Sequence, residues 1–148
     1  MFMDKQFIFV DLEVNSREEV LTLLGDRLLK LGYVKKGFTE SVIEREKHFP
    51  TGLPTAPYGI AIPHTDGDEV IQSKLVFASL KHPVQFKLMG GSEQAIQVSL
   101  VMMMALETGH CQIRILQKLM EVFQNEALVH RLKQTKNINQ IRKVLDLS

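Results

Sequence analysis

Three residues placed at the ends of separate segments are candidates for chemistry on an anionic group: Arg45, His64 and His110. A neutral imidazole is a good nucleophile near neutral pH, and a guanidinium holds carboxylate or phosphate oxygens through paired donors. A histidine nucleophile with cationic neighbours describes a phosphoryl site. Two histidines together also suggest a metal site, so the residue types alone leave two chemistries open.

His64 follows a short apolar run, residues 59–62, and then Pro63. It therefore emerges where a strand is expected to end, and ligands of α/β sheets gather at such ends. Pro63 restricts the backbone just before the imidazole. The alternative is a turn histidine without a function, and the residues alone do not decide between the two interpretations.

His110 and Arg45 also carry two interpretations each. His110 precedes Ile113 by three residues, which places it in the first turn of an expected helix, where backbone N–H groups favour an anion. It could equally be a neutral histidine that packs at a helix start. Arg45 lies four residues before Phe49 on the border of a buried helix face, but its neighbour Glu44 also fits an ordinary solvated face.

The motifs that the sequence lacks narrow the chemistry. No His-x-x-x-His or Cys-x-x-Cys pair occurs, and the acidic residues 65–69 lack the ligand spacing of a calcium loop, so we expect no metal. A phosphate-binding P-loop and a Gly-x-Ser-x-Gly elbow are also missing. A phosphoryl site in this chain would therefore receive its group from another protein rather than from ATP, and we expect no cofactor.

The elements that must position these residues can be predicted from periodicity and punctuation. Residues 7–10 predict a strand. Ser16 and Glu19 have capping-box spacing before a helix whose leucines recur through Leu31, with Gly32 closing it. Thr39 predicts the cap of a second helix that runs to about His48. Residues 49–57 hold three prolines and a glycine and predict a loop.

The second half of the chain predicts a group of strands followed by helices. Strands are expected at residues 59–62, 75–80, 84–88 and 96–104, with Lys81-His82-Pro83 as the turn between the second and third. The last of them alternates at first and then becomes apolar on both sides, a pattern that suits a central strand. A helix is expected from Thr108 or Gly109, and two shorter helices within residues 126–147. The whole chain, residues 1–148, is expected to form one α/β domain.

Composition excludes several classes of function. The net charge is +1, from 18 basic and 17 acidic residues, which argues against nucleic-acid binding. The single cysteine, Cys111, favours a reducing cytoplasm. No apolar run approaches the ~20 residues that cross a bilayer, and the N-terminus does not read as a signal peptide. We therefore expect a cytoplasmic protein without direct membrane insertion.

Beyond these patterns, three segments resemble one known family in the same order. Gly59-Ile-Ala-Ile-Pro-His64 is similar to the phosphorylation motif of the fructose/mannitol class of enzyme IIA, in the bacterial phosphoenolpyruvate-dependent sugar phosphotransferase system (PTS). Arg45-Glu46-Lys47 resembles the stretch with the family's active-site arginine, and His110-Cys-Gln-Ile113 the place of its second histidine. Residues 49–54, Phe-Pro-Thr-Gly-Leu-Pro, look most like the galactitol-specific branch. Thr65 departs from the glycine that commonly follows the histidine.

The resemblance implies the fold of that family, a mixed β-sheet flanked by helices on both faces. It also implies that His64 accepts a phosphoryl group from the phosphocarrier protein HPr and passes it to a cysteine of the cognate enzyme IIB. The membrane component IIC would be reached only indirectly. Arg45 and His110 would stabilise the phosphoryl group or orient His64, and Leu53, Ile60 and Ile113 would lie on an apolar rim.

Family members of a second kind carry the same histidine but regulate other proteins through their phosphorylation state. That regulatory role is the alternative function, for which the acceptor histidine would be the same. A metal-binding or structural module built on His64 and His110 is a further alternative.

Overall fold

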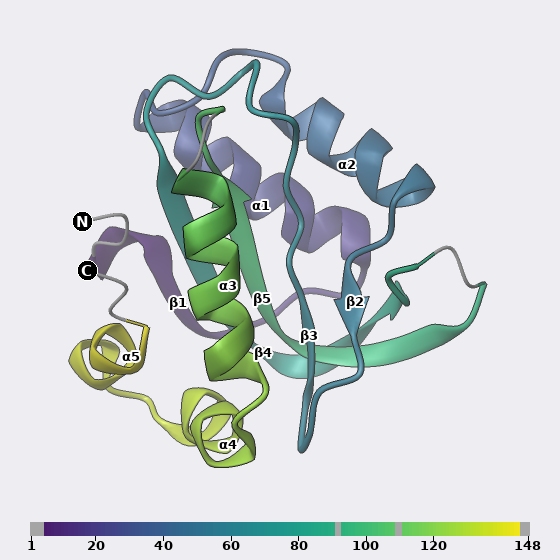
Figure 1. Ribbon diagram of the computed structural model, residues 1–148, viewed down its shortest axis with the longest axis vertical. Coiled ribbons are helices and arrows are strands. Elements are labelled where there is room, and N and C mark those ends of the chain that lie inside the picture. The colour runs from purple at the N-terminus through teal and green to yellow at the C-terminus, as the bar shows by residue number, and fades with distance from the viewer. Residues whose placement is uncertain (1–4, 91–92, 109–110, 146–148) are drawn as a thin grey trace.

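Within the part of the chain that the structure describes, residues 5–90, 93–108 and 111–145, five strands form one mixed sheet with helices on both faces (Figure 1). The structure is a computed structural model. In chain order the elements are a 3₁₀ turn (Lys5–Phe7), β1 (Ile8–Leu12), α1 (Arg17–Lys30), α2 (Phe38–His48), β2 (Gly52–Leu53), β3 (Gly59–Ala61), β4 (Lys74–Lys87), β5 (Ala95–Ala105), α3 (Cys111–Phe123), α4 (Glu126–Gln134) and α5 (Ile138–Val144).

The two long strands β4 and β5 form the centre of the sheet. They pair antiparallel from Lys74 opposite Ala105 to Lys87 opposite Ala95. On one side β1 runs parallel to β4, and on the other β3 runs parallel to β5, with the short β2 antiparallel at the edge. The strand order is β1-β4-β5-β3-β2. The predicted mixed sheet with a doubly buried central strand is confirmed.

Two apolar clusters, one on each face, hold the layers together. On the first face α1 and α2 pack residues such as Leu24 and Val42 against Val76 and Val101. On the second face α3, α4 and α5 cover residues of β3, β4 and β5, and Phe123 is fully enclosed there. In Figure 1 α1 and α2 lie behind the sheet and α3 crosses in front of it.

The first helix begins and ends as predicted. The Ser16 hydroxyl accepts a hydrogen bond from the Glu19 amide at 3.1 Å, and the Glu19 carboxylate accepts from the Asn15 amide, one residue before the position that a standard capping box would use. Gly32 follows the helix with a φ of 83°, which is the left-handed conformation that favours glycine after a helix end.

The predicted cap of α2 is wrong. Gly37, with a φ of 101°, occupies the N-cap position, and Thr39 lies inside the helix. Thr39 is buried against α1 and its hydroxyl donates to Asp26 at 2.9 Å. A threonine near a helix start was thus a packing residue between two helices rather than a cap.

Two predictions about strands need correction. Residues 75–80 and 84–88 are not two strands but parts of the single strand β4, whose register shifts between Ser79 and Val84. Such a bulge accommodates Pro83, which is exposed there and has no amide proton to donate. The predicted loop 49–57 contains β2, where Gly52 lies so close to the Lys87 carbonyl that a Cβ would be 2.6 Å from it.

The two C-terminal helices, interrupted at residues 135–137, are confirmed as α4 and α5. The predicted start of the preceding helix at Thr108 or Gly109 falls partly outside the described residues, and α3 is described from Cys111. Among the helices of the described residues, none has the length and apolar character to cross a membrane.

Candidate active site

His64 lies where β3 runs out along the end of β5. The Pro63 carbonyl accepts a hydrogen bond from the Met104 amide at 2.9 Å, and His64 itself forms an isolated parallel bridge with Met104. The pairing between the two strands therefore continues beyond β3 as far as the histidine. This extension fixes the backbone that carries the imidazole, as the strand-end position predicts.

The imidazole has one nitrogen tied to the main chain. Nδ1 of His64 lies 2.8 Å from the Ile62 carbonyl oxygen. A carbonyl only accepts, so the proton of the neutral ring lies on Nδ1, which donates it, and Nε2 keeps its lone pair. The local backbone thus selects the tautomer in which Nε2 is the nucleophilic atom.

The surroundings keep this ring uncharged. Burial lowers the pKa of His64 below 6.5, the Arg45 charge lowers it further, and the Ile62 carbonyl and the Asp66 carboxylate oppose that shift. Because the net direction is downward, the free lone pair on Nε2 is present at neutral pH.

Arg45 stands in the last turn of α2 with its charge directed to the loop after His64. Its Nη1 donates to Asp66 Oδ1 at 2.7 Å, and its guanidinium carbon lies 5.1 Å from the centre of the Phe49 ring. Nε of Arg45 is buried and, among the residues described, has no hydrogen-bond partner. The structure thus brings Arg45 into the electrostatic surroundings of His64.

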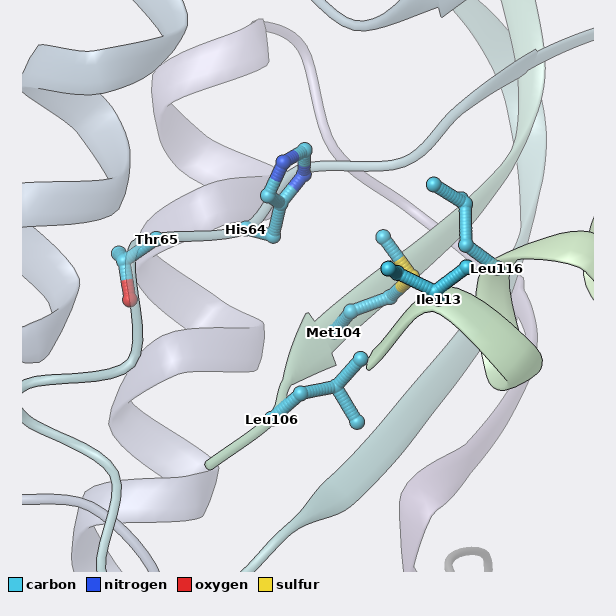
Figure 2. A pocket seen from close by; sticks show the side chains of 6 residues that line it. All are labelled: His64, Thr65, Met104, Leu106, Ile113 and Leu116. Atoms are coloured by element: carbon cyan, nitrogen blue, oxygen red, sulfur yellow. The ribbon is translucent and has the colours of Figure 1, made fainter. Parts of the chain in front are cut away.

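Beside His64 lies a small pocket whose walls are largely apolar. Figure 2 shows the imidazole across from Ile113 and Leu116 of α3, with Met104 and Leu106 at the end of β5 and Thr65 after the histidine. Ile113 is 61% exposed and Leu116 37%. These exposed apolar side chains give the opening of the pocket a surface that water covers poorly.

A buried carboxylate supports the segment between Arg45 and His64. Glu46, 4% exposed, accepts from the Thr51 amide and from the Thr51 hydroxyl, both at 2.8 Å. The Thr51 carbonyl in turn accepts from the Ile62 amide at 3.4 Å. A chain of contacts therefore links the end of α2 to Ile62, whose carbonyl holds the imidazole.

The remaining candidates divide clearly. His110 lies outside the described residues. Of the expected rim residues, Ile113 lines the pocket, but Leu53 and Ile60 are buried in the second cluster because β2 and β3 direct them into the core. His48 and His130 are exposed on helices. Within the described ranges no group of three or more His, Cys, Asp or Glu side chains could hold a metal ion.

Sequence reasoning missed two residues of this site, Glu46 and Asp66. Both are acidic residues in charged runs, which usually face solvent. The signal for Glu46 was its place three residues after Ile43 and four after Val42, on the inward side of α2. The signal for Asp66 was its place two residues after the histidine, a separation that lets its carboxylate reach a cation beside the ring.

The chain is similar to known proteins over most of its length. Residues 1–147 match the family described as "Phosphoenolpyruvate-dependent sugar phosphotransferase system, EIIA 2". The galactitol-specific EIIA component of Escherichia coli K12 is 30% identical over 132 residues, which are 89% of this chain and 84% of that protein.

Two solved structures share the fold over nearly the full length. The crystal structure of IIA mannitol from Escherichia coli superposes with a TM-score of 0.81 at 26% identity, covering 98% of this chain and 99% of that one. The same enzyme IIA in complex with phosphorylated enzyme IIB, also from Escherichia coli, gives 0.82 at 25% identity, covering 97% and 96%.

Proposed function

The chain belongs to the EIIA 2 family of the phosphoenolpyruvate-dependent sugar phosphotransferase system, and we propose that His64 is the residue that accepts the phosphoryl group. The observation that carries the proposal is the hydrogen bond from Nδ1 of His64 to the Ile62 carbonyl. It leaves Nε2 as the free nucleophile beside an apolar pocket, with a cation in electrostatic reach.

The proposed reaction is a transfer between two nitrogen nucleophiles. The lone pair of Nε2 attacks the phosphorus of a phosphohistidine on HPr, the P–N bond of the donor breaks, and its electron pair returns to the donor ring. The proton on Nδ1 stays in place. In the product the ring of His64 carries positive charge, which the Ile62 carbonyl stabilises through the same hydrogen bond.

Arg45 supplies the charge that the phosphoryl oxygens require. Its guanidinium carries donors that are not all used, since Nε has no partner among the described residues. Phosphoryl transfer depends mainly on positioning and on such electrostatic stabilisation. We assign the same role, or that of orienting His64, to His110, on the resemblance alone.

The onward step delivers the group to a cysteine of an enzyme IIB. The thiolate attacks phosphorus, the P–Nε2 bond breaks, and the electron pair returns to Nε2, which restores the starting tautomer. The exposed apolar side chains Ile113 and Leu116 give both partners a surface on which to dock in turn. The mannitol relative in complex with a phosphorylated IIB supports this choice of partner, and the galactitol relative supports galactitol or a related polyol as the transported sugar.

The acceptor is tested by labelling the protein with phosphoenolpyruvate, enzyme I and HPr, and by comparing wild type with His64→Ala. Wild type should gain one acid-labile phosphoryl group and His64→Ala none. His48→Ala, which removes an exposed histidine paired with Glu44, is the matched control and should label fully. Equal label on His64→Ala and wild type would overturn the assignment. In the labelled protein, ¹⁵N–³¹P coupling should place the phosphorus on Nε2.

The carrier role is tested by adding an enzyme IIB to the labelled protein. A carrier should lose its label within the mixing time of a quench experiment, and a galactitol-type IIB should accept it faster than a mannitol-type IIB. Label that survives in the presence of both would favour the regulatory alternative.

A further inference from the structure

Asp66 is the direct partner of the arginine at this site. Its Oδ1 lies 2.7 Å from Nη1 of Arg45, in a pair whose side chains are 75% and 30% exposed. Asp66 therefore faces solvent while the arginine side chain is largely covered. In the unphosphorylated protein the positive charge beside His64 is already matched by a carboxylate.

The arginine is nevertheless only partly satisfied. Its Nε is buried and has no hydrogen-bond partner within residues 5–90, 93–108 and 111–145, and its guanidinium lies over the ring of Phe49. Both charges act on His64, because Arg45 lowers the pKa of the imidazole and Asp66 raises it. Any group that arrives on Nε2 of His64 must therefore come within electrostatic range of both charges.

A phosphoryl group on His64 changes the balance of this pair. It brings nearly two negative charges and three acceptor oxygens to the side of Arg45. The arginine then has two anionic partners, and its pairing with one weakens its pairing with the other. The Asp66 carboxylate also repels this dianion.

We propose that Asp66 is a positioning residue that competes with the phosphoryl group for Arg45 and so favours the release of that group from His64. The inference rests on the proposed function of His64. The carboxylate stabilises the unphosphorylated protein through the ion pair and destabilises the phosphorylated one through repulsion. Both effects shift the equilibrium in the same direction, away from the phosphoprotein.

The test measures an equilibrium rather than a rate. Phospho-HPr is first separated from phosphoenolpyruvate and enzyme I, so that no new label can form. It is then incubated with an equimolar amount of this protein until the distribution of label is constant. Only the P–N bonds are exchanged between two imidazoles, so the ratio of labelled proteins reports their relative stability. A change in docking alone alters how fast the ratio is reached and leaves its value unchanged.

Asp66→Asn should raise the equilibrium constant for phosphorylation by roughly two- to fivefold, the range that corresponds to a partly exposed ion pair. Asp66→Glu keeps the charge and should remain within about twofold of wild type. Asp68→Asn is the matched control, since it removes the same charge from an exposed side chain in the same loop. It should leave the constant unchanged.

A double-mutant cycle with Arg45→Ala separates the two contributions of Asp66. Without the arginine, Asp66→Asn should change the constant less than it does in wild type, because competition for the cation no longer exists. An Asp66→Asn constant equal to wild type, or equal to that of Asp68→Asn, would overturn the inference. Failure of wild type itself to take label at His64 would instead overturn the proposed function.

Discussion

Glu46 offers the sharpest test of how the fold supports the site. Replacement by alanine removes both acceptors of Thr51, whose amide and hydroxyl are buried with it. Replacement by glutamine keeps a carbonyl for the amide, and its NH₂ group can donate to the hydroxyl oxygen. The two variants therefore differ in hydrogen bonding while both remove the carboxylate charge.

The expected magnitude follows from the two orphaned groups. Each buried polar group left without a partner costs about 1–3 kcal/mol, and removal of a buried charge offsets part of the sum. Glu46→Ala should therefore lose roughly 2–4 kcal/mol of unfolding free energy. Glu46→Gln should remain within about 1 kcal/mol of wild type, because it leaves no buried group unpaired.

Urea unfolding at several pH values measures both effects. Burial raises the pKa of the Glu46 carboxyl above its ordinary 4.5, against the hydrogen bonds from Thr51, which lower it. The contribution of this group is thus fully present below about pH 4.5 and is lost as the pH rises through the raised pKa. Wild type should gain stability relative to Glu46→Gln as the pH falls through that window.

Two outcomes would refute the reasoning about Glu46. Equal stabilities of the alanine and glutamine variants would mean that the bonds to Thr51 contribute little. A difference between wild type and Glu46→Gln that is constant with pH would mean that the carboxyl is not perturbed in the fold. If Glu46→Ala also transfers the phosphoryl group more slowly at temperatures where it remains folded, the bonds of Glu46 to Thr51 contribute to the position of His64 as well as to stability.

Three further outcomes are expected. The ring resonances of His64 should titrate with a midpoint below pH 6.5, and a midpoint above 6.5 by NMR would contradict this. The contribution of neutral His64 to the free energy of unfolding should be fully present above pH 6.5 and be lost as the pH falls, because the unfolded chain binds the proton more tightly. Ile113→Asp should raise the KM for phospho-HPr about tenfold by placing a charge on the proposed docking surface. Leu29→Asp, at a 38% exposed position on the opposite helical layer, should leave the KM unchanged. Equal KM values for the two variants would count against this docking surface. Gly67→Ala should lower the melting temperature by more than Gly90→Ala. Both glycines have a φ near 100°, but of the two only Gly67 would place a Cβ 2.8 Å from a backbone carbonyl oxygen, the one just after β5. Equal losses of stability would show that backbone conformation alone decides.

The sequence predicted an element best where the period of its apolar residues and its capping or breaking residues indicate the same boundaries. The helix after Ser16 was predictable because its cap and its leucines indicate the same boundaries. The central strand β5 was predictable because its second half, from Leu100 to Met104, is apolar on both sides, as in a strand that is buried on both faces. The position of His64 at a strand end followed from Pro63, since a proline rarely continues a ladder.

Other features depend on partners that lie far away in the sequence. Pro83 lies in a bulge rather than a turn because β5 continues beside it, and nothing local reveals that neighbour. Asp66 is paired with Arg45, 21 residues earlier. Leu53 is buried in the second apolar cluster, which only the assembled fold creates. A local sequence pattern indicates whether a residue is suited to a strand, a helix or a turn. Its contacts depend on segments that only the fold brings next to it.

The bond between Nδ1 of His64 and the Ile62 carbonyl has a consequence for how sequences of this kind can diverge. The acceptor belongs to the main chain, so every residue type at position 62 supplies it, and no substitution of that side chain removes it. The tautomer therefore depends on the path of the backbone and not on the identity of a partner side chain. Insertions or deletions between β3 and the histidine would disturb it, whereas point substitutions there would pass with little effect on which nitrogen is free. The tautomer of His64 is in this respect protected from point substitution, the commonest kind of genetic change.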